Sequence, residues 1–380
     1  VRDLGVCVHI GGTNGKGSCA AFVESIARCS GLRTALFTSP HLERFAERMQ
    51  VGGRPLDEEL ILAAYERMRE VVASYAADDQ PSFFEQITIV GLHLLAQARP
   101  ELSVIEVGLG GRLDATNVIR AEVACVTGVA LDHQDVLGND LQEIAREKAG
   151  IFKAGQRVVI GCSGLAEAVP TLIEAAERAG VASSTVVRRP LADSSPLGLA
   201  GSYQRANAAA ALAVVAELQA LKVLPVDPQL VAAGLARTRH PGRIEQVGAR
   251  PRVILDGAHN PHGAAALAVE MAAWPGPRVL VVGVSGDKDL AGILEPLRAA
   301  ADLVIATSGS HPRLRPAAEV AAGIRGRDGL VVDDLAVALE LAKQRAGSDG
   351  TVVVAGSLFL VGEARQLVRL AGRGLSHAHA

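Results

Sequence analysis

The sequence is poor in aromatic residues and has little excess of either charge. Aromatic side chains make up 3% of the 380 residues, and 38 basic residues nearly balance 41 acidic ones, for a net charge of −3. Surfaces that bind nucleic acid or anionic membranes usually carry a basic excess, which this composition lacks. We therefore expect small-molecule ligands, and neither nucleic acid nor a membrane as a partner.

Long apolar runs and paired cysteine motifs are also missing. The apolar segments are short and interrupted by glycine or charge, so none is long enough to span a bilayer. The N-terminus lacks the basic-then-apolar pattern of a secretion signal. The cysteines are odd in number and form no C-x-x-C pair: Cys7, Cys19, Cys29, Cys125 and Cys162. This usage is typical of free thiols in a reducing compartment, and it predicts a cytoplasmic protein.

Hydrophobic residues, in contrast, are abundant at 49%, which is enough for a well-buried globular protein. A chain of this length exceeds what one core usually supports, so two domains are expected. Short β-branched runs predict strands at 6–10, 33–37, 102–107, 123–128, 157–161, 252–256, 279–284, 302–306, 329–332 and 351–355. Helical periodicity is found at 18–30, 57–75, 83–98, 141–149, 165–179, 204–220, 260–273, 290–300, 316–324 and 334–346. This alternation predicts α/β architecture with mainly parallel sheets.

The stretch "GGTNGKGS", residues 11–18, has the composition of a phosphate-binding loop between a strand and a helix. Backbone N–H groups of such a turn and the helix N-terminus attract phosphate, and Lys16 would reach the terminal phosphates. The usual loop has a glycine at the position of Ile10 and a hydroxyl directly after the lysine, where this chain has Gly17. The alternative is a simple glycine-rich turn, and we favour the nucleotide site.

Ser39 is a candidate for the missing hydroxyl that would hold magnesium. It follows the predicted strand 33–37, and ligands of parallel α/β sheets gather at the carboxyl ends of strands. Taken alone, Ser39-Pro40 is a turn signal. Glu106 ends another apolar strand, where a carboxylate is costly unless it is paired or holds a cation. If Glu106 does not hold a cation, the alternative is that it forms a salt bridge, for example with Arg112.

Further candidates follow other strands. Asp132, His133 and Asp135 come after the strand 123–128, although a lone histidine is usually structural and magnesium prefers oxygen ligands. Lys148 closes a short helix, where a lysine can simply interact with the helix dipole. Asp256 again ends an apolar strand with a carboxylate before a polar turn.

The adjacent Phe83 and Phe84 are unusual in a chain so poor in aromatic residues. Either they pack against a flat ring of a substrate or they fill the core. The turn "SGDKD", 285–289, should face a cleft or be a solvated surface turn.

Taken together, the motifs resemble the folylpolyglutamate synthase/dihydrofolate synthase family of the Mur ligase superfamily. The matching blocks cover essentially the whole chain in order: "GTNGKGS" (12–18), "FTSPHL" (37–42), "FFEQIT" (83–88), "EVGLGGRLDATN" (106–117), "LDHQDVLG" (131–138), "REKAGIFK" (146–153), "HPGRIE" (240–245), "DGAHNPHG" (256–263), "GVSGDKD" (283–289) and "AGSLFLVGE" (355–363).

The resemblance implies roles for the first part of the chain. ATP phosphates would be held by Gly12, Thr13, Asn14, Gly15, Lys16, Gly17 and Ser18. Two magnesium ions would be placed by Ser39, Glu106 and His133, with Lys148 as a carbamate that binds the second ion. Asn207 would contact adenine, although the family often has His-Gln where this chain has Tyr203-Gln204. Phe83 and Phe84 would contact the pterin if they are not core residues.

The resemblance also implies roles for the second part of the chain. Arg243, Asp256 and His259 match residues between the domains that contact nucleotide phosphates and help to place the incoming glutamate. Ser357 matches another residue on the substrate face. Lys16, Lys148, Asp256 and His259 would thus form the catalytic set, with His259 or the carbamate assisting deprotonation of the amine.

The alternation and the resemblance together predict an α/β protein with two domains. Residues 1–238 would form a P-loop ATPase domain with a mainly parallel sheet, 239–245 a hinge, and 246–380 a smaller Rossmann-like glutamate-ligase domain. Family members usually carry a few dozen residues before the phosphate-loop strand. Here that segment either lies outside the printed sequence or is absent from the protein. The family is usually monomeric.

The expected activity is ATP-dependent addition of L-glutamate to dihydropteroate, to folate polyglutamates, or to both, through an acyl phosphate. A peptidoglycan-precursor ligase of the same superfamily is the alternative among ligases. A P-loop kinase or GTP-binding switch is disfavoured, because Lys16 is not followed by Ser or Thr and no N-K-x-D motif is present. A catalytically dead module is disfavoured because Lys16, Glu106 and Asp256 are all retained.

Overall fold

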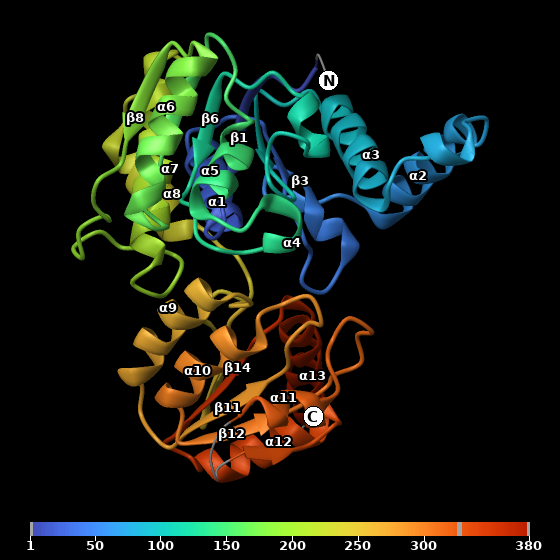
Figure 1. Cartoon of the computed structure of the whole chain (residues 1–380), viewed down its shortest axis with the longest axis vertical. Helices are drawn as coiled ribbons and strands as arrows, with labels where there is room; N and C mark the ends of the chain where they lie inside the picture. Colours follow the sequence, from blue (N-terminus) through green and yellow to red (C-terminus); the bar gives the residue numbers. More distant parts are fainter. Residues whose placement is uncertain (1–2, 325–328, 378–380) are drawn as a thin grey trace. The chain divides into compact units, whose positions relative to one another are not determined.

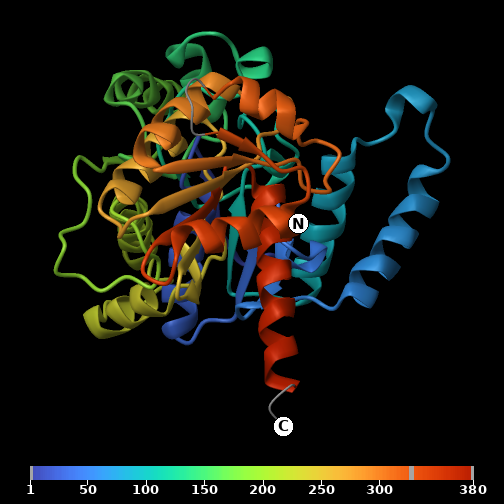
Figure 2. The ribbon, with the colours of Figure 1, turned by 90° about the horizontal axis from the view of Figure 1, so that it is seen from below.

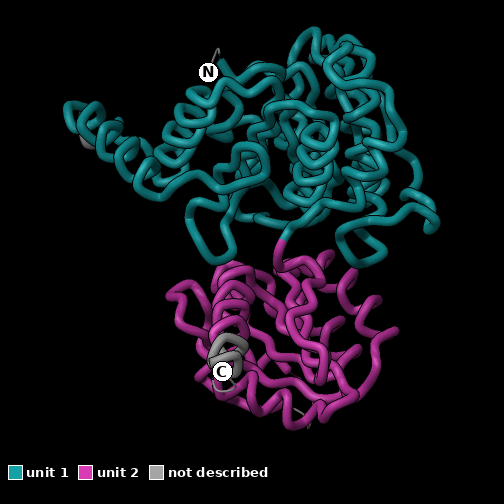
Figure 3. Tube along the Cα trace, turned by 180° about the vertical axis from the view of Figure 1, so that it is seen from behind, with its two compact units in different colours: residues 1–240 teal, residues 241–380 magenta. Residues whose placement is uncertain are grey.

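The computed structural model describes residues 3–324 and 329–377, which fall into two compact units. Unit 1 is Val1–His240 and unit 2 is Pro241–Ala380 (Figure 3). The junction between them lies within the residues expected to form the linker, 239–245. Each unit contains one mainly parallel β-sheet with helices packed against it (Figure 1), which confirms the α/β class.

Unit 1 is built on an eight-stranded sheet in the order β4-β3-β2-β5-β1-β6-β7-β8. Neighbouring strands from β2 to β8 run parallel, and the β2–β3 and β3–β4 pairs are antiparallel. The strands are β1 (Val6–Gly11), β2 (Thr34–Phe37), β3 (Met49–Val51), β4 (Arg54–Pro55), β5 (Leu102–Glu106), β6 (Val123–Val126), β7 (Arg157–Ile160) and β8 (Ser183–Val186). Ile10 is paired with Glu106, so the carboxyl ends of β1 and β5 lie side by side.

The helices of unit 1 connect these strands. They are α1 (Lys16–Cys29), α2 (Glu58–Val72), α3 (Phe83–Gln97), α4 (Gln134–Leu137), α5 (Leu141–Ala149), α6 (Val169–Ala179), α7 (Gln204–Ala220) and α8 (Pro228–Arg237). Short 3₁₀ turns are η1 (Phe45–Arg48), η2 (Ala77–Asp79), η3 (Ala115–Val118) and η4 (Ala166–Ala168). Figures 1 and 2 show α2 and the loop after it standing away from the sheet.

The central strand β1 is buried on both faces. Val8 and Ile10 pack into one apolar cluster with residues of α1 and α7, whereas Cys7 packs into another cluster with residues of α3. Successive side chains of a strand point to opposite faces, so a strand covered on both sides needs apolar residues throughout. His9 is the exception in β1, because it is polar and yet 1% exposed.

Unit 2 contains a six-stranded sheet in the order β13-β12-β11-β14-β10-β9, in which only the β10–β9 pair is antiparallel. Its strands are β9 (Glu245–Ala249), β10 (Arg252–Leu255), β11 (Arg278–Val282), β12 (Leu303–Ala306), β13 (Gly329–Val331) and β14 (Thr351–Ala355). Its helices are α9 (Pro261–Ala272), α10 (Leu290–Ala300), α11 (Ala317–Ala322), α12 (Leu335–Ala346) and α13 (Leu358–His377). Across the described residues of both units, no helix has the length and apolarity needed to cross a membrane.

Candidate functional site

The glycine-rich loop connects β1 to α1 at the point where the sheet reverses its strand order. Strand β1 lies between β5 and β6. From β1 the chain continues to β2, toward one edge of the sheet, whereas from β6 it continues to β7, toward the opposite edge. Ligands of open α/β sheets bind at such switch points, outside the carboxyl ends of the strands. Thr127, which directly follows β6, donates a hydrogen bond from its hydroxyl to the Asn14 carbonyl at 2.7 Å.

Two glycines of this loop are required by its geometry. Gly12 has φ 138° and Gly15 has φ 80°, a region that residues with a side chain rarely adopt. A Cβ on Gly12 would lie 2.1 Å from the Thr127 hydroxyl oxygen, and one on Gly15 would lie 2.0 Å from Oδ1 of Asn207. The loop is further fixed by a hydrogen bond from the Thr13 amide to the Gly128 carbonyl at 2.9 Å.

The N-terminus of α1 has no capping side chain. Its N-cap residue is Gly15, which has no side chain to accept a hydrogen bond from the first turn. An uncapped N-terminus presents N–H groups and partial positive charge to an anion. The Lys16 ammonium group donates to the Thr13 carbonyl at 3.2 Å, so it lies over the loop. This arrangement is suited to binding a polyphosphate.

The structure brings Ser39 and Glu106 together beside the loop. The Ser39 amide donates to Oε2 of Glu106 at 3.1 Å, although the two residues are 67 positions apart. The same oxygen lies 3.3 Å from where a Cβ on Gly17 would stand, so Gly17 leaves room for the carboxylate at the start of α1. Arg112, the alternative partner of Glu106, instead forms an ion pair with Glu147 at 2.9 Å.

Glu106 is 5% exposed, and a buried carboxylate needs compensation. Arg48 supplies part of it: burial lowers the pKa of the Arg48 guanidinium, and the nearby Glu106 carboxylate opposes that change. Arg48 also donates to Nδ1 of His41 at 2.8 Å. A carboxylate and a serine hydroxyl are oxygen ligands of the kind that hard divalent cations prefer, so this pair fits a metal beside the phosphates.

His133 lies at the start of α4 with φ 51°, a strained value for a residue that is not glycine. Its amide donates to Oδ1 of Asp132 at 2.9 Å, and its Nε2 lies 3.9 Å from the same oxygen. Among residues 3–324 and 329–377, no three His, Cys, Asp or Glu side chains gather as a metal-binding cluster. The expected ligand set includes only two residues of these types, Glu106 and His133, so it would depend on Ser39 and Lys148 for the rest.

Lys148 is next to last in α5 and 4% exposed. Its ammonium nitrogen donates to the Gly12 carbonyl at 3.2 Å, so its side chain reaches the phosphate loop. Asn207 also reaches this loop, and its amide is engaged in protein contacts. Its Oδ1 accepts from the Ser163 hydroxyl at 2.7 Å, and its Nδ2 donates to Gln204 at 2.9 Å.

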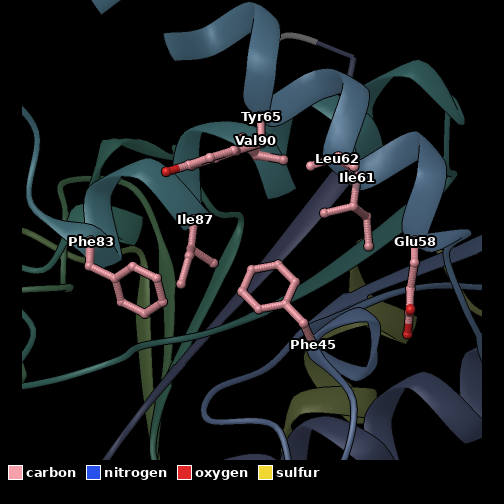
Figure 4. Close-up of a pocket in the computed structure, with 8 residues that line it drawn as sticks. All are labelled: Phe45, Glu58, Ile61, Leu62, Tyr65, Phe83, Ile87 and Val90. Atoms are coloured by element: carbon pink, nitrogen blue, oxygen red, sulfur yellow. The ribbon is translucent and has the colours of Figure 1, made fainter.

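Phe83 and Phe84 differ in their surroundings. Phe83 is 68% exposed and therefore is not a core residue. It lines an apolar pocket of about 280 Å³ between α2 and α3, together with Phe45, Glu58, Ile61, Leu62, Tyr65, Ile87 and Val90 (Figure 4). Phe84 is partly buried against the adjacent core, and its ring lies 2.3 Å from where a Cβ on Gly108 would stand. The glycine at position 108 therefore makes room for this ring.

In unit 2, the Asp256 carboxylate holds two turns together. It is 3% exposed, and it accepts from the Ile244 amide at 2.9 Å and from the Ala258 amide at 2.9 Å. The Gly257 amide donates to the Gly242 carbonyl at 2.8 Å. Ile244 has φ 46°, which is strained for a β-branched residue, so these hydrogen bonds stabilise an unfavourable backbone conformation.

Arg243, His259 and Ser357 surround these turns at the carboxyl ends of β10 and β14. Arg243 lies against Gly257, 2.3 Å from where a Cβ would stand, and Nδ1 of His259 is 2.7 Å from the Gly257 carbonyl. The Gly356 amide donates to the Ala258 carbonyl at 3.0 Å, which joins the Ser357 turn to the same group. The Ser357 hydroxyl lies 3.2 Å from that of Ser285.

Three further residues of unit 1 contribute to the site, although the sequence did not single them out. Thr127 braces the phosphate loop, Arg48 lies near Glu106, and Nε2 of His240 lies 2.7 Å from where a Cβ on Gly17 would stand. His240 falls within the quoted "HPGRIE" block and Thr127 directly follows a strand. Arg48 has no local signal, because only the folded chain brings it to Glu106.

Comparison with known proteins gives consistent matches over nearly the whole chain. Residues 242–358 match the family model described as Mur ligase, glutamate ligase domain. The chain is 35% identical to the dihydrofolate synthase/folylpolyglutamate synthase of Escherichia coli, over 94% of this chain and 86% of that protein.

Two solved structures are similar throughout. One is E. coli FolC in complex with DHPP and ADP, with a TM-score of 0.87 and 33% identity, covering 98% of this chain and 91% of that chain. The other is the bifunctional folylpolyglutamate synthase/dihydrofolate synthase with Mn, AMPPNP and L-glutamate bound, with a TM-score of 0.84 and 30% identity. It covers 96% of this chain and 89% of that chain.

Proposed function

Because this chain belongs to the folylpolyglutamate synthase/dihydrofolate synthase family, we propose that it is an ATP-dependent ligase that adds L-glutamate to dihydropteroate, to folate polyglutamates, or to both. The reaction gives ADP and phosphate. The observation that carries the proposal is the Ser39–Glu106 pair beside an uncapped, glycine-rich phosphate loop. That arrangement joins a polyphosphate site to a divalent-cation site, which a ligase of this kind requires.

The chemistry explains why ATP is needed. A carboxylate is a poor electrophile, and its oxygen is a poor leaving group, so it does not react with an amine in water. Transfer of the γ-phosphoryl group to the acceptor carboxylate gives an acyl phosphate. The glutamate amine then attacks the carbonyl carbon, and phosphate leaves from the tetrahedral intermediate. Phosphoryl transfer depends mainly on positioning and charge neutralisation.

We assign the positioning roles in unit 1 as follows. The loop from Gly12 to Ser18 binds the phosphates, and Lys16 neutralises charge on the terminal ones. Ser39 and Glu106 hold a magnesium ion, and His133 and a carbamylated Lys148 complete the sites for two ions. Bound magnesium supplies charge neutralisation at the transferred phosphoryl group. Asn207 takes part in nucleotide binding through its contact with the phosphate loop.

Roles in unit 2 and at the acceptor site complete the proposal. Arg243 and Asp256 act toward the nucleotide phosphates, and His259 and Ser357 act toward the incoming glutamate. Asp256 has a structural part as well, because both of its oxygens accept backbone N–H groups. Phe83 and Phe84 contact the pterin end of the acceptor. Residues 1–238 form the ATP-binding domain and 246–380 the glutamate-ligase domain of a cytoplasmic monomer.

An ADP-release assay with ATP, magnesium and glutamate tests this proposal. We expect turnover with dihydropteroate or tetrahydrofolate, and none without an acceptor or without glutamate. Peptidoglycan precursors serve as the matched comparison, because a ligase of the related class would use them. Glutamate-dependent turnover that requires neither pterin would contradict the folate assignment.

The metal assignment has its own test. Glu106→Gln keeps the size of the side chain and its contact with the Ser39 amide, but it removes the charge. We expect it to weaken manganese binding, measured by electron paramagnetic resonance in the presence of a non-hydrolysable ATP analogue. Glu147→Gln is the matched control, because that carboxylate pairs with Arg112 and is not assigned to the metal.

A further inference from the structure

His9 is a buried polar residue for which the proposed mechanism has no role. It lies in the central strand β1 and is 1% exposed. Its Nε2 is 2.8 Å from the hydroxyl oxygen of Thr116, a residue 107 positions away in η3. Its Nδ1 is buried and has no hydrogen-bond partner within the part of the chain that the structure describes. Leaving such an acceptor unpaired costs free energy, so a buried histidine here calls for an explanation.

The hydrogen bonds beyond Thr116 form a chain with one direction. The Thr116 hydroxyl donates to Oδ1 of Asp114 at 2.5 Å. A hydroxyl has a single proton, and an ionised carboxylate can only accept, so Thr116 must give its proton to Asp114. Nε2 of His9 must therefore carry a proton and donate it to Thr116. The ring is the Nε2–H tautomer, which leaves Nδ1 with a bare lone pair.

The environment of His9 keeps the ring neutral. Burial, assisted by the positive charge of Lys153, lowers the pKa of His9 to about 3. The ammonium group of Lys153 donates to the carbonyls of Asn117 and Ile119, which lie in and just after η3, the turn that contains Thr116. The His9 ring is therefore neutral near neutral pH. Each hydrogen bond from His9 through Thr116 to Asp114 then has one fixed donor and one fixed acceptor.

Asp114 uses this chain to set the conformation of the loop 108–114. Its Oδ2 accepts from the Leu109 amide at 2.8 Å, and its Oδ1 also accepts from the Thr116 amide at 2.9 Å. The loop begins two residues after Glu106 of β5, the carboxylate assigned to the metal. The rotamer of one buried aspartate therefore decides where the backbone after that metal ligand runs.

Two other assigned residues depend on the same loop. On one side, Gly108 lies against the ring of Phe84. On the other side, the Arg112 amide donates to the Glu147 carbonyl at 2.9 Å, and a Cβ on Gly111 would lie 2.6 Å from the Lys148 carbonyl oxygen. The loop is thus packed between Phe84 and the end of α5.

We propose that His9 is a positioning residue of the ligase, which acts through Thr116 and Asp114 to hold the loop 108–114 against Phe84 and the end of α5. The inference rests on the proposed function, because it assigns Phe84 to the acceptor. It predicts that breaking the chain weakens acceptor use. The effect on ATP use should be smaller, because Thr127 and Gly128 also hold the phosphate loop.

The test compares variants at both ends of the chain in the full-length protein. Thr116→Val keeps the shape of the side chain but cannot relay the hydrogen bond, and His9→Phe removes the donor. We expect each to raise KM for the pterin acceptor about tenfold, the effect of one lost buried hydrogen bond, with a clearly smaller change in KM for ATP. The conservative variants Thr116→Ser and His9→Gln retain a donor and should restore KM toward the wild-type value.

A matched control separates positioning from stability. Ser103 of β5 has a fully buried hydroxyl, as Thr116 does. It donates to the Leu4 carbonyl at 2.6 Å, a contact that does not involve the loop 108–114. Ser103→Ala should lower the melting temperature without changing KM for the acceptor. If Thr116→Val behaves in the same way, His9 is merely structural and the inference is wrong. If His9→Phe does not fold, the Thr116 pair still decides the question.

The tautomer gives a second, spectroscopic test. Nitrogen NMR of the wild-type protein should show one histidine held as the neutral Nε2–H form from pH 7 to pH 5, and His9→Gln should remove that signal. A signal with the proton on Nδ1 would contradict the direction of the chain. Absence of pterin-dependent turnover in the wild type would instead overturn the proposed function, and the NMR result would still stand.

Discussion

At the residue scale, the buried Glu106 is the sequence feature that most directly indicates a metal site. Burying an uncompensated carboxylate costs several kcal/mol, so a glutamate at the end of an apolar strand needs a partner. The structure provides the Ser39 amide and the nearby Arg48 charge, and it leaves the carboxylate facing Gly17. These contacts explain how the residue is tolerated before any metal binds.

Lys16 is the residue whose loss should most directly affect phosphoryl transfer. Its ammonium group already lies over the phosphate loop, where it donates to the Thr13 carbonyl. Lys16→Ala should lower kcat about a hundredfold or more with little change in melting temperature, because it removes charge stabilisation from the transition state. Rapid-quench assays of ADP formation measure the effect. Lys343→Ala, which breaks an exposed pair with Glu340 on α12, is the control. An unchanged rate in Lys16→Ala would mean that the loop is misassigned.

His9 should make the protein sensitive to acid. Its pKa is lowered from 6.5 to about 3 in the folded state, so below pH 6.5 the unfolded chain binds a proton that the folded chain does not. The contribution of His9 to the free energy of unfolding is therefore fully present above pH 6.5 and is lost as the pH falls toward 3. Between pH 7 and pH 5 the loss is about 2 kcal/mol.

Urea unfolding of the wild type and of His9→Gln at several pH values measures this effect. The glutamine does not titrate, so the difference in unfolding free energy between the two proteins should shift by that amount in favour of the variant at low pH. A pH-independent difference would show that His9 has the same pKa in the folded protein as in the unfolded chain.

At the scale of elements, the strand-to-helix connections carry most of the site. The alternation in the sequence predicted the principal strands and helices, and the structure has β1, β5, β6, β10 and β14 at the expected places within one or two residues. It missed the short antiparallel strands β3 and β4 at the edge of the first sheet, because two or three residues carry no periodicity.

Other missed elements did carry a signal. The helix α8 begins with Asp227 as its N-cap and Pro228 in its first turn, a pattern typical of a helix start. The helix α13 extends from Leu358 to His377, whereas the sequence was interpreted there only as the motif "AGSLFLVGE".

Gly15 of the phosphate loop and Gly31, which follows α1, form a matched pair of glycines for a test at this scale. Gly15 and Gly31 have similar φ values, 80° and 87°, but an added Cβ would meet Asn207 at Gly15 and nothing within 4 Å at Gly31. Gly15→Ala should raise KM for ATP strongly, because the loop must move away from Asn207. Gly31→Ala should lower stability by about 1 kcal/mol through backbone strain and leave KM unchanged. Equal kinetic effects of the two variants would contradict the close-contact argument.

At the scale of the whole molecule, each unit has a separate sheet and its own buried core. We therefore expect two unfolding transitions in calorimetry. ADP with magnesium should raise the melting temperature of unit 1. Its free energy of unfolding should increase by about 2.7 kcal/mol when the ligand is present at a hundred times its Kd. The result would support the assignment of ATP binding to residues 1–238.

Core variants identify the transitions. Val8→Ala lies in the core of unit 1 and Leu280→Ala lies in that of unit 2, and both residues are fully buried. Each should lower the free energy of unfolding of its own unit by about 1 to 4 kcal/mol and so shift only one of the two transitions. A nucleotide shift that follows the Leu280-sensitive transition alone would contradict the domain assignment.

By itself, the sequence determined the fold class, the phosphate loop and the family, since these depend on local spacing: glycines between a strand and a helix, carboxylates at strand ends, and motifs in a fixed order. The tertiary structure decided which of these residues meet. Ser39 reaches Glu106 across 67 positions and His9 reaches Thr116 across 107, because strand order places β5 beside both β1 and β2. It also decided that Phe83 faces a pocket while Phe84 packs inward, since adjacent side chains at a helix start point in different directions. Long-range strand pairing is not encoded in any short segment, so contacts that depend on it could not be predicted from local pattern alone.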